Sequence, residues 1–289
     1  MNPSIGASRA DRCDNSGVAL LAVLWLVAAL SIMLLGITHA IRAEVIIASD
    51  VRSREVNIGL ADAAIRMTLQ ELIASKKLMV RSVQRSVVSV FGHDIGIEIV
   101  PMNGYIDLNN ASLDLLSDTF EYGAGVTKAD AQKFAASAIE YRGRVNGIGE
   151  SMKFHAVEEM LQLPGINYSV YTRLKHSVTT DITGGGRVNP LASTSQTLGI
   201  LARGNVDYAN QVAEASIASP ESVDTSKLTA AHIEMTPTGY LSVRAKVRNS
   251  STSHLVRDWH VDVSSSAHGL PWRTIRAESI VIFDVVAVQ

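Results

Sequence analysis

Residues 18–37 read VALLAVLWLVAALSIMLLGI, without a charged side chain in the whole run. Each residue of an α-helix adds about 1.5 Å, so a run of this length matches the hydrocarbon thickness of a bilayer, about 30 Å. The run begins directly after Gly17, at the end of a polar leader, MNPSIGASRADRCDNSG. We therefore expect residues 18–40 to form a transmembrane or filament-core helix that carries the rest of the chain.

The residues alone leave three interpretations of the leader open. A secretory signal peptide has a shorter apolar region, of about 7–15 residues, although Thr38-His39-Ala40 would serve as its cleavage site. A cut between Gly17 and Val18 would leave the apolar run at the mature N-terminus. Without a cut, the run would be a single-pass anchor. The leader gives only a weak signal for the orientation of the apolar run in a membrane, because its two aspartates offset its two arginines.

The chain keeps a helical pattern after the apolar run. Residues 40–77 contain no proline, and their apolar residues recur at spacings of three and four. This spacing predicts an amphipathic helix. Together with the apolar run it gives about 60 helical residues, roughly 90 Å in length. One half of such a helix suits a membrane or a helix bundle, and the other half can carry a globular head.

Strand patterns lie on both sides of a long helical stretch. Residues 83–91 and 94–100 are rich in β-branched residues and are joined by Gly92-His93, which predicts a β-hairpin. Residues 104–180 have mostly helical patterns, and residues 239–247 alternate as a half-buried antiparallel strand does. These patterns indicate an α+β fold, in which a long N-terminal helix packs on a small antiparallel sheet with an inserted all-α domain.

We divide the chain into five segments. They are a leader (1–17), the transmembrane or filament-core helix (18–40), an amphipathic stalk helix with the first strands of the head (41–103), the inserted α-helical domain (104–180) and the remainder of the β head (181–289). Three consecutive glycines at 184–186 are expected to give a flexible joint after the insert.

The composition excludes several classes of protein. The formal net charge is −2, so no strong positive field draws the chain to nucleic acid. The only cysteine is Cys13, so a disulfide framework and a thiolate metal site are excluded. The eight histidines lack the spacing of a zinc helix, and no nucleophile elbow, phosphate loop or dinucleotide fingerprint occurs. We predict that the protein is not an enzyme and requires no cofactor.

Four stretches, in their order along the chain, resemble the K protein family of type II secretion, a family of minor pseudopilins. They are GVALLAVLWLVAAL at 17–30, GYIDLNNAS at 104–112, VEEMLQLPGI at 157–166 with VTT at 178–180, and RVNPLAS at 187–193. The leader, Gly17 and the apolar run together resemble the class III signal of type IV pilins and pseudopilins. Most pilins have Glu at the fifth mature position, where this chain has Ala22, and that departure is typical of the K family.

The resemblance implies processing and a place of action. A prepilin peptidase would cut after Gly17 and methylate Val18, and Ala22 and Trp25 would pack in the filament. The head would be pilin-like with an inserted α-domain, held by a single-pass helix in the inner membrane of a Gram-negative bacterium and facing the periplasm. The protein would cap the tip of the periplasmic pseudopilus and take part in its initiation and in protein export across the outer membrane.

The resemblance also implies partners. They are the I and J minor pseudopilins, the major pseudopilin, the inner-membrane assembly platform and the prepilin peptidase, with a secreted substrate or the outer-membrane secretin as further contacts. Nucleic acid is not among them.

The family has been associated with calcium near its α-domain, so calcium is implied by resemblance only and its ligands are unknown here. Asp107, Asp114, Asp118 and Glu121 are candidates by composition alone. A regular calcium loop, with oxygens at alternating positions and a central Gly, does not occur. The chain also departs from the family pattern at Met102 and Asn103, where an acid is common, and at Leu191, where a second Asn is common.

Two other functions compete with the pseudopilin interpretation. The helical insert resembles the helix-hairpin-helix units of DNA-uptake proteins, with Gly165 and Ile166 at the hairpin, which would suit a minor pilin of a type IV or uptake pilus. Phosphate binding needs clustered cations, but only Arg173 and Lys175 lie near and two glutamates precede them. We therefore favour Pro164-Gly165 as a simple turn between helices. The third function is that of a single-pass periplasmic adaptor.

Overall fold

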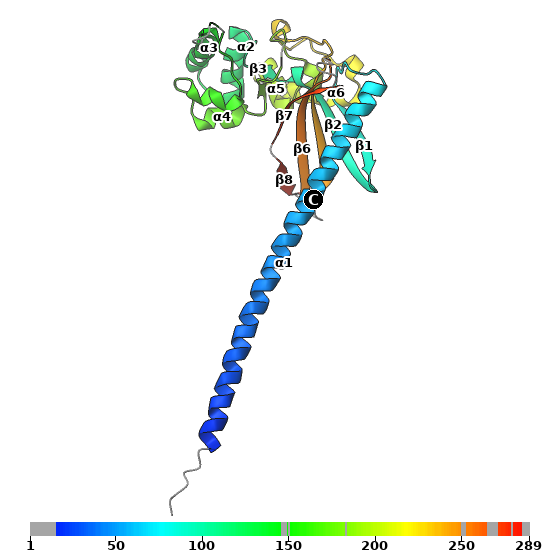
Figure 1. Ribbon diagram of the computed structural model, residues 1–289. Coiled ribbons are helices and arrows are strands. Elements are labelled where there is room, and N and C mark those ends of the chain that lie inside the picture. Colours follow the sequence, from blue (N-terminus) through cyan, green and yellow to red (C-terminus); the bar gives the residue numbers. More distant parts are fainter. Residues whose placement is uncertain are drawn as a thin grey trace, which may run out of the picture. The chain divides into compact units, whose positions relative to one another are not determined.

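A computed structural model describes residues 16–145, 149, 151–182, 184–249, 253–264, 271–278 and 280–284, with the side chains of 16–19, 37–40, 43, 46 and 284 left out. Residues 1–15 of the predicted leader lie outside the described residues. The chain forms two compact units, Met1–Glu55 and Val56–Gln289, and helix α1 (Ser16–Ala74) contributes to both (Figure 1). The predicted long N-terminal helix is therefore present.

The second unit is built around one antiparallel sheet. Its strands are β1 (Gln84–Val90), β2 (His93–Pro101), β5 (Tyr240–Arg248), β6 (Ser253–Asp262), β7 (Arg273–Ala277) and β8 (Val281–Asp284). They are ordered β1-β2-β5-β6-β7, and β8 pairs with β6 next to β7. Figure 1 shows the part of α1 that belongs to this unit, from Val56 onward, lying along the sheet.

The apolar face of α1 forms the core of this unit. Leu60, Ala64, Ile65, Leu69 and Leu72 recur at helical spacing and are buried against the sheet. The strands contribute alternate residues to the same core, because successive side chains of a strand point to opposite faces of the sheet. The buried set from the strands is Val90 of β1, Ile95, Ile97 and Ile99 of β2, Leu241, Val243, Ala245 and Val247 of β5, and Leu255, Trp259 and Val261 of β6.

Strands β2 and β5 are neighbours although the residues between them, 102–239, form a separate layer. Their register pairs Ile97 with Ala245 and Glu98 with Arg244. A sheet whose adjacent strands are this far apart in sequence contains an insertion. The structure thus confirms the α+β fold with an inserted helical domain, and it buries Trp259 as a core residue.

The helical layer consists of short elements. They are η1 (Met102–Gly104), β3 (Ile106–Asp107), α2 (Leu113–Asp118), η2 (Thr119–Gly123), α3 (Lys128–Gly143), η3 (Val157–Gln162), α4 (Tyr168–Leu174), β4 (Val178–Thr179), η4 (Pro190–Ala192), α5 (Ser195–Leu201), α6 (Val206–Ala218), η5 (Pro220–Ser222) and η6 (Ala230–His232). Residues 157–162, within the stretch of mostly helical patterns at 104–180, form a 3₁₀ helix, a form favoured in short pieces.

Two features define the extent of this layer. Strands β3 and β4 pair in parallel, Ile106 with Val178, and this joins the two ends of the segment that the sequence assigns to the insert. One hydrophobic cluster, however, runs from Ile106 to Leu228 and includes α5 and α6. The helical core therefore continues past residue 180 into the segment that the sequence pattern assigns to the β head.

Polar residues at the start of the helices explain why they begin where they do. The side chains of Ser112, Thr127, Asn167, Thr194 and Asn205 each accept a hydrogen bond from the backbone N–H three residues on. Such caps satisfy N–H groups that have no partner within the helix.

Gly186 packs closely, unlike the open joint that three consecutive glycines predict. Its backbone has φ +70°, and a Cβ placed there would lie 2.0 Å from the carbonyl oxygen of Asn110. Gly186 therefore lets the chain after the insert lie directly against the turn that follows β3.

We expect Gly186→Ala to destabilise the protein by about 2–4 kcal/mol, because the new methyl group clashes with backbone and the positive φ disfavours any L side chain. Gly59→Ala is the matched control, since its Cβ meets nothing within 4 Å in α1. That change should be neutral or stabilising by up to about 1 kcal/mol. Urea unfolding of the full chain in detergent measures both, and equal effects would contradict the packed role of Gly186.

The role of α1 in the core is tested by Ile65→Ala. Ile65 is fully buried, so truncation should lower the free energy of unfolding by about 2–5 kcal/mol. Met67, two residues on, is 46% exposed, so Met67→Ala should change the free energy of unfolding by less than about 0.5 kcal/mol. A small effect at Ile65 in the same unfolding measurement would show that α1 does not hold the sheet.

Candidate functional surfaces

The first surface is the N-terminal part of α1. Every side chain from residue 20 to residue 36 is exposed, and this stretch contains no charged residue. Trp25 is 73% exposed and Ala22 lies in the same stretch. Exposed apolar area costs about 25 cal/mol per Å², and soluble monomers rarely show contiguous patches larger than a few hundred Å². This part of α1 therefore needs an apolar environment that its own unit does not supply.

Within the part of the chain that the structure describes, no helix proves long and apolar enough to cross a membrane. The transmembrane assignment of residues 18–40 stays a prediction. Gly17 and Val18 lie in α1, but their side chains are outside those described. The predicted processing at these two residues and the filament packing of Ala22 and Trp25 stay predictions as well.

The second surface lies in the second unit, between the sheet and the helical layer. The face of the sheet opposite α1 carries polar and charged side chains, and together with η3, α4 and β4 it borders a cavity of about 1040 Å³. Five basic and five acidic residues line this cavity, so its formal charges balance. The basic residues are Arg85, Lys175, Arg244, Lys246 and Arg276, and the acidic ones are Glu98, Glu158, Asp181, Asp258 and Glu278.

Arg244 of β5 is the centre of one polar network in this cleft. Its Nε donates to Asp258 Oδ2 at 2.6 Å, and its Nη2 donates to Tyr105 Oη at 2.7 Å. Burial alone would lower the pKa of Arg244, but the neighbouring Tyr105 and Asp258 outweigh burial and raise the pKa. Burial raises the pKa of Tyr105. Since Tyr105 belongs to the helical layer, this bond ties that layer to the sheet.

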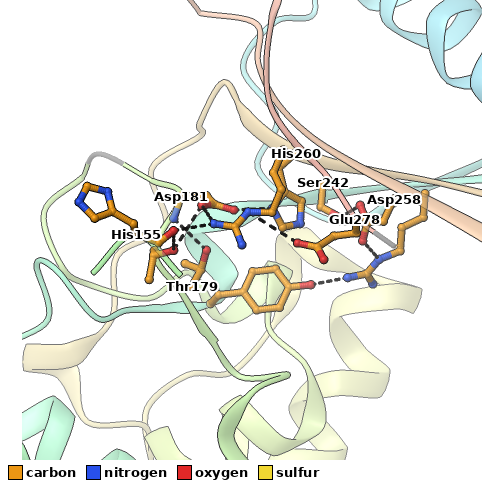
Figure 2. Close-up of polar contacts among 11 residues, drawn as sticks. His155, Thr179, Asp181, Ser242, Asp258, His260 and Glu278 are labelled. Atoms are coloured by element: carbon orange, nitrogen blue, oxygen red, sulfur yellow. Dashed lines mark hydrogen bonds and ion pairs between the residues drawn. The ribbon is translucent and has the colours of Figure 1, made fainter. Parts of the chain in front are cut away.

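Asp181 is the centre of the second network. It follows β4, and its Oδ2 lies 2.8 Å from His260 Nδ1 of β6, while its Oδ1 accepts from Arg276 Nη2 at 2.8 Å. Figure 2 shows Asp181 and His260 pointing toward one another across the cleft. Burial alone would raise the pKa of Asp181, but the hydrogen bond with His260 and the charge of Arg276 outweigh it and lower the pKa. Arg276 also donates to the carbonyl oxygen of His155. The two networks together form an ionic joint between the layers.

Asp181, His260 and Glu278 place ligand atoms within 4.8 Å of one another, which makes them a group of described residues that could hold a metal ion. One imidazole and two carboxylates suit a transition metal more than calcium. Arg276, however, already lies against Asp181 at 2.8 Å and Glu278 at 3.8 Å. A metal ion would have to displace this guanidinium, so the group serves as an ion-pair cluster.

The four acids that composition suggests for calcium are not assembled as ligands among the described residues. Asp107 is buried and accepts hydrogen bonds from the backbone N–H of Asn109 and the side chain of Asn110. Burial raises its pKa. Asp118 pairs with Arg203 at 3.3 Å and lies 3.6 Å from His232. Asp114 and Glu121 are not grouped with either of them. Calcium therefore stays a prediction without an assigned ligand set.

Sequence reasoning missed the ionic joint. It treated the histidines as isolated, whereas the structure pairs His260 with Asp181, 79 positions away. One signal was present: in the strand at 240–248 the alternation places Ser242, Arg244 and Lys246 on the face opposite the core. A face this polar on a sheet that is covered on both sides requires partners, but their identity depends on the insert.

The hairpin that resembles a DNA-binding unit is a packed turn. Gly165 has φ +85°, and a Cβ there would lie 2.8 Å from the ring of Phe134. Chain direction changes between η3, which ends at Gln162, and α4, which begins at Tyr168. Arg173 Nη1 donates to the carbonyl oxygen of Ala124 at 2.6 Å. The one arginine near the hairpin thus already has an internal acceptor.

The fold and these surfaces define a class of protein: an α+β head built on the C-terminal part of a long helix whose N-terminal part, at residues 20–36, is exposed and free of charge within the described part of the chain. No family model matches the chain, and no curated protein matches it. The chain is similar to one in the crystal structure of the GspK-GspI-GspJ complex from the Type 2 Secretion System of enterotoxigenic Escherichia coli.

That similarity covers 82% of this chain and 98% of the other, with 13% sequence identity and a TM-score of 0.46. The complex includes the K protein of type II secretion, the family that the four sequence stretches resemble. A likeness of this size does not carry a function from that complex to this chain.

The ionic joint predicts a defined pH dependence. The folded pKa of Asp181 is lowered, so its contribution to stability is present above the unfolded pKa, about 3.9, and is lost as pH falls through the folded pKa. Asp181→Asn should cost about 1.5–3 kcal/mol at pH 7, because charge-assisted hydrogen bonds are lost. Below about pH 4 the difference between the variant and the wild type should shrink.

Chemical unfolding of the full chain at a series of pH values measures this dependence. Asp94→Asn, at an exposed position of β2, is the matched control and should stay within about 0.5 kcal/mol of the wild type at pH 7. A constant difference between Asp181→Asn and the wild type from pH 7 to pH 3 would contradict the ionic role of Asp181.

Proposed function

We propose that the chain is a non-enzymatic minor pseudopilin of a type II secretion system, located at the tip of the periplasmic pseudopilus. The observation that supports the proposal is that the two parts of α1 differ in burial. Residues 60–72 contribute one apolar face, including Leu60, Ile65 and Leu69, to the core of the head, whereas residues 20–36 of the same helix carry no charge and are exposed. A subunit of this kind is suited to exchange lipid contacts for contacts with parallel helices.

Such an exchange can be nearly balanced in free energy. Lipid tails and the apolar side chains of neighbouring helices offer similar surroundings to residues such as Leu24 and Leu26, so moving α1 from the inner membrane into a filament exposes little apolar surface to water. The head stays in the periplasm in both states. Assembly and extraction therefore need no chemistry at the subunit itself, in keeping with a structural role.

Two features favour the tip. The helical layer adds a second hydrophobic core beside the sheet, and its bulk would obstruct a further subunit stacked above the head. Ala22 stands where most pilins carry Glu, whose carboxylate is thought to pair with the N-terminal amine of a neighbouring subunit. A terminal subunit has no such neighbour on one side. The proposed partners are the I and J minor pseudopilins, and through them the major pseudopilin and the assembly platform.

The mature N-terminus tests the proposal. The full chain should begin with N-methylated Val18 in cells that contain prepilin peptidase and should keep Met1 in cells that lack it. Mass spectrometry of the purified protein measures both. Gly17→Ala is expected to slow or block the cut, whereas Gly36→Ala, which changes a glycine inside α1, should leave it intact.

The alternatives predict other N-termini. Retention of Met1 with the peptidase present would favour a simple single-pass adaptor. A start at Ile41 would show that the apolar run is a cleaved signal peptide. Salt-dependent binding of DNA by the full chain, together with a start at Val18, would favour an uptake pilus.

A further inference from the structure

Strand β1 forms a border of the sheet, and none of the residues that the structure describes pairs with its outer edge. It pairs with β2 through a two-residue turn, in which Phe91 has φ +49° and Gly92 has φ +81°. Both angles are positive, as a type I′ turn requires. Because Val90 and His93 close this turn, the alternate residues Gln84, Ser86, Val88 and Val90 direct their backbone groups to β2. Arg85, Val87 and Ser89 then direct theirs to the free edge.

Beyond Arg85, whose side chain pairs with Glu98 of β2, this edge lacks the features that protect natural sheet edges. Residues 86–91 read SVVSVF and contain no charge and no proline. Val87 is 69% exposed and Phe91 is 91% exposed. Charged side chains, proline and very short strands are the usual protection against strand addition. The opposite border has two of them, since β7 carries Arg273 and Arg276 and β8 has only four residues.

Phe91 supplies an independent observation. It occupies a left-handed conformation that L side chains rarely adopt and that Asn and Gly fill in most turns of this type. It is also the most exposed of the large apolar side chains that the structure describes. Backbone strain and exposure both disfavour an aromatic residue here, unless the side chain is buried against something outside the chain.

We propose that the β1 edge, from Arg85 to Phe91, binds an extended, uncharged strand of a different pilin-like subunit by strand addition, with Phe91 as the apolar anchor at its end. Main-chain hydrogen bonds would supply affinity, and contacts with alternate side chains such as Val87 would supply specificity. This inference rests on the proposed function, because it takes the occupant to be a neighbouring subunit of the same assembly.

A second copy of this chain is a poorer occupant. Two β1 edges that meet antiparallel are related by a two-fold axis perpendicular to the sheet. That axis would set the 60–72 segments of the two α1 helices antiparallel, whereas subunits held by one membrane or one filament have parallel helices. A different subunit, which presents another strand, is free of this restriction.

The test blocks the edge without breaking the β1–β2 ladder. Val87→Pro removes an N–H that faces the free edge, and Val87→Lys adds a charge of the kind that protects edges. Val87→Thr keeps the β-branched shape and the N–H and is the matched control. The full-length variants are co-expressed with the I and J type minor pseudopilins of the same cell, extracted in detergent and purified by a tag on this chain. Circular dichroism and the unfolding midpoint establish that each variant is folded.

We expect both Val87→Pro and Val87→Lys to reduce recovery of one minor pseudopilin at least tenfold, and Val87→Thr to leave it unchanged. A photo-crosslinker at position 87 should join this chain to an extended segment of that same subunit, as peptide mass spectrometry can show. Full recovery with folded Val87→Pro and Val87→Lys would overturn the inference and leave the proposed function intact. A homodimeric crosslink at position 87 would also overturn it. Failure of the wild-type chain to recover either pseudopilin would overturn the proposed function and this inference together.

Discussion

The burial of one face of α1 against the sheet is the interaction on which the rest of the structure depends. Leu60, Ile65 and Leu69 lie on one stripe of the helix, and alternate residues of β2, β5 and β6 meet them. The strands are antiparallel and come from distant parts of the chain, so without the helix their apolar face would have no cover. Because α1 also continues to residue 16, the interaction that forms the head is the one that attaches it to the apolar segment.

The sheet is then shared between two different layers. Its apolar face packs against α1, and its polar face lines the cleft between the sheet and the helical layer. Tyr105 and Asp181 reach from the insert to Arg244, His260 and Arg276 on the strands, so the two layers are joined by charge-assisted hydrogen bonds. A polar joint of this kind is directional, and it fixes the insert without extending the hydrophobic core across the sheet. If the insert lies at the tip of a filament, this joint fixes the orientation of the insert relative to the sheet.

Much of the fold could be predicted from local patterns. The absence of proline between residues 40 and 77, the β-branched runs at 83–100 and the alternation at 239–247 each indicated the element that formed there. The insertion followed from their order. The extent of the helical core could not be read in this way, because α5 and α6 carry the same patterns whether they pack on the insert or on the sheet. The ionic joint was missed for a related reason, since its members come from separate segments that lie far apart in the sequence.

The sequence by itself determined that an uncharged run of twenty residues leads into a helix and that a head of mixed helix and sheet follows. These properties arise from neighbouring residues, whose spacing and polarity act over one helical turn or one strand. Only the tertiary structure decided that Asp181 meets His260, that Gly186 must lie against Asn110, and that β1 is left at the border of the sheet with Phe91 exposed. Such contacts depend on which layers close on one another, and a contact between residues this far apart in the chain leaves no periodic trace in the sequence.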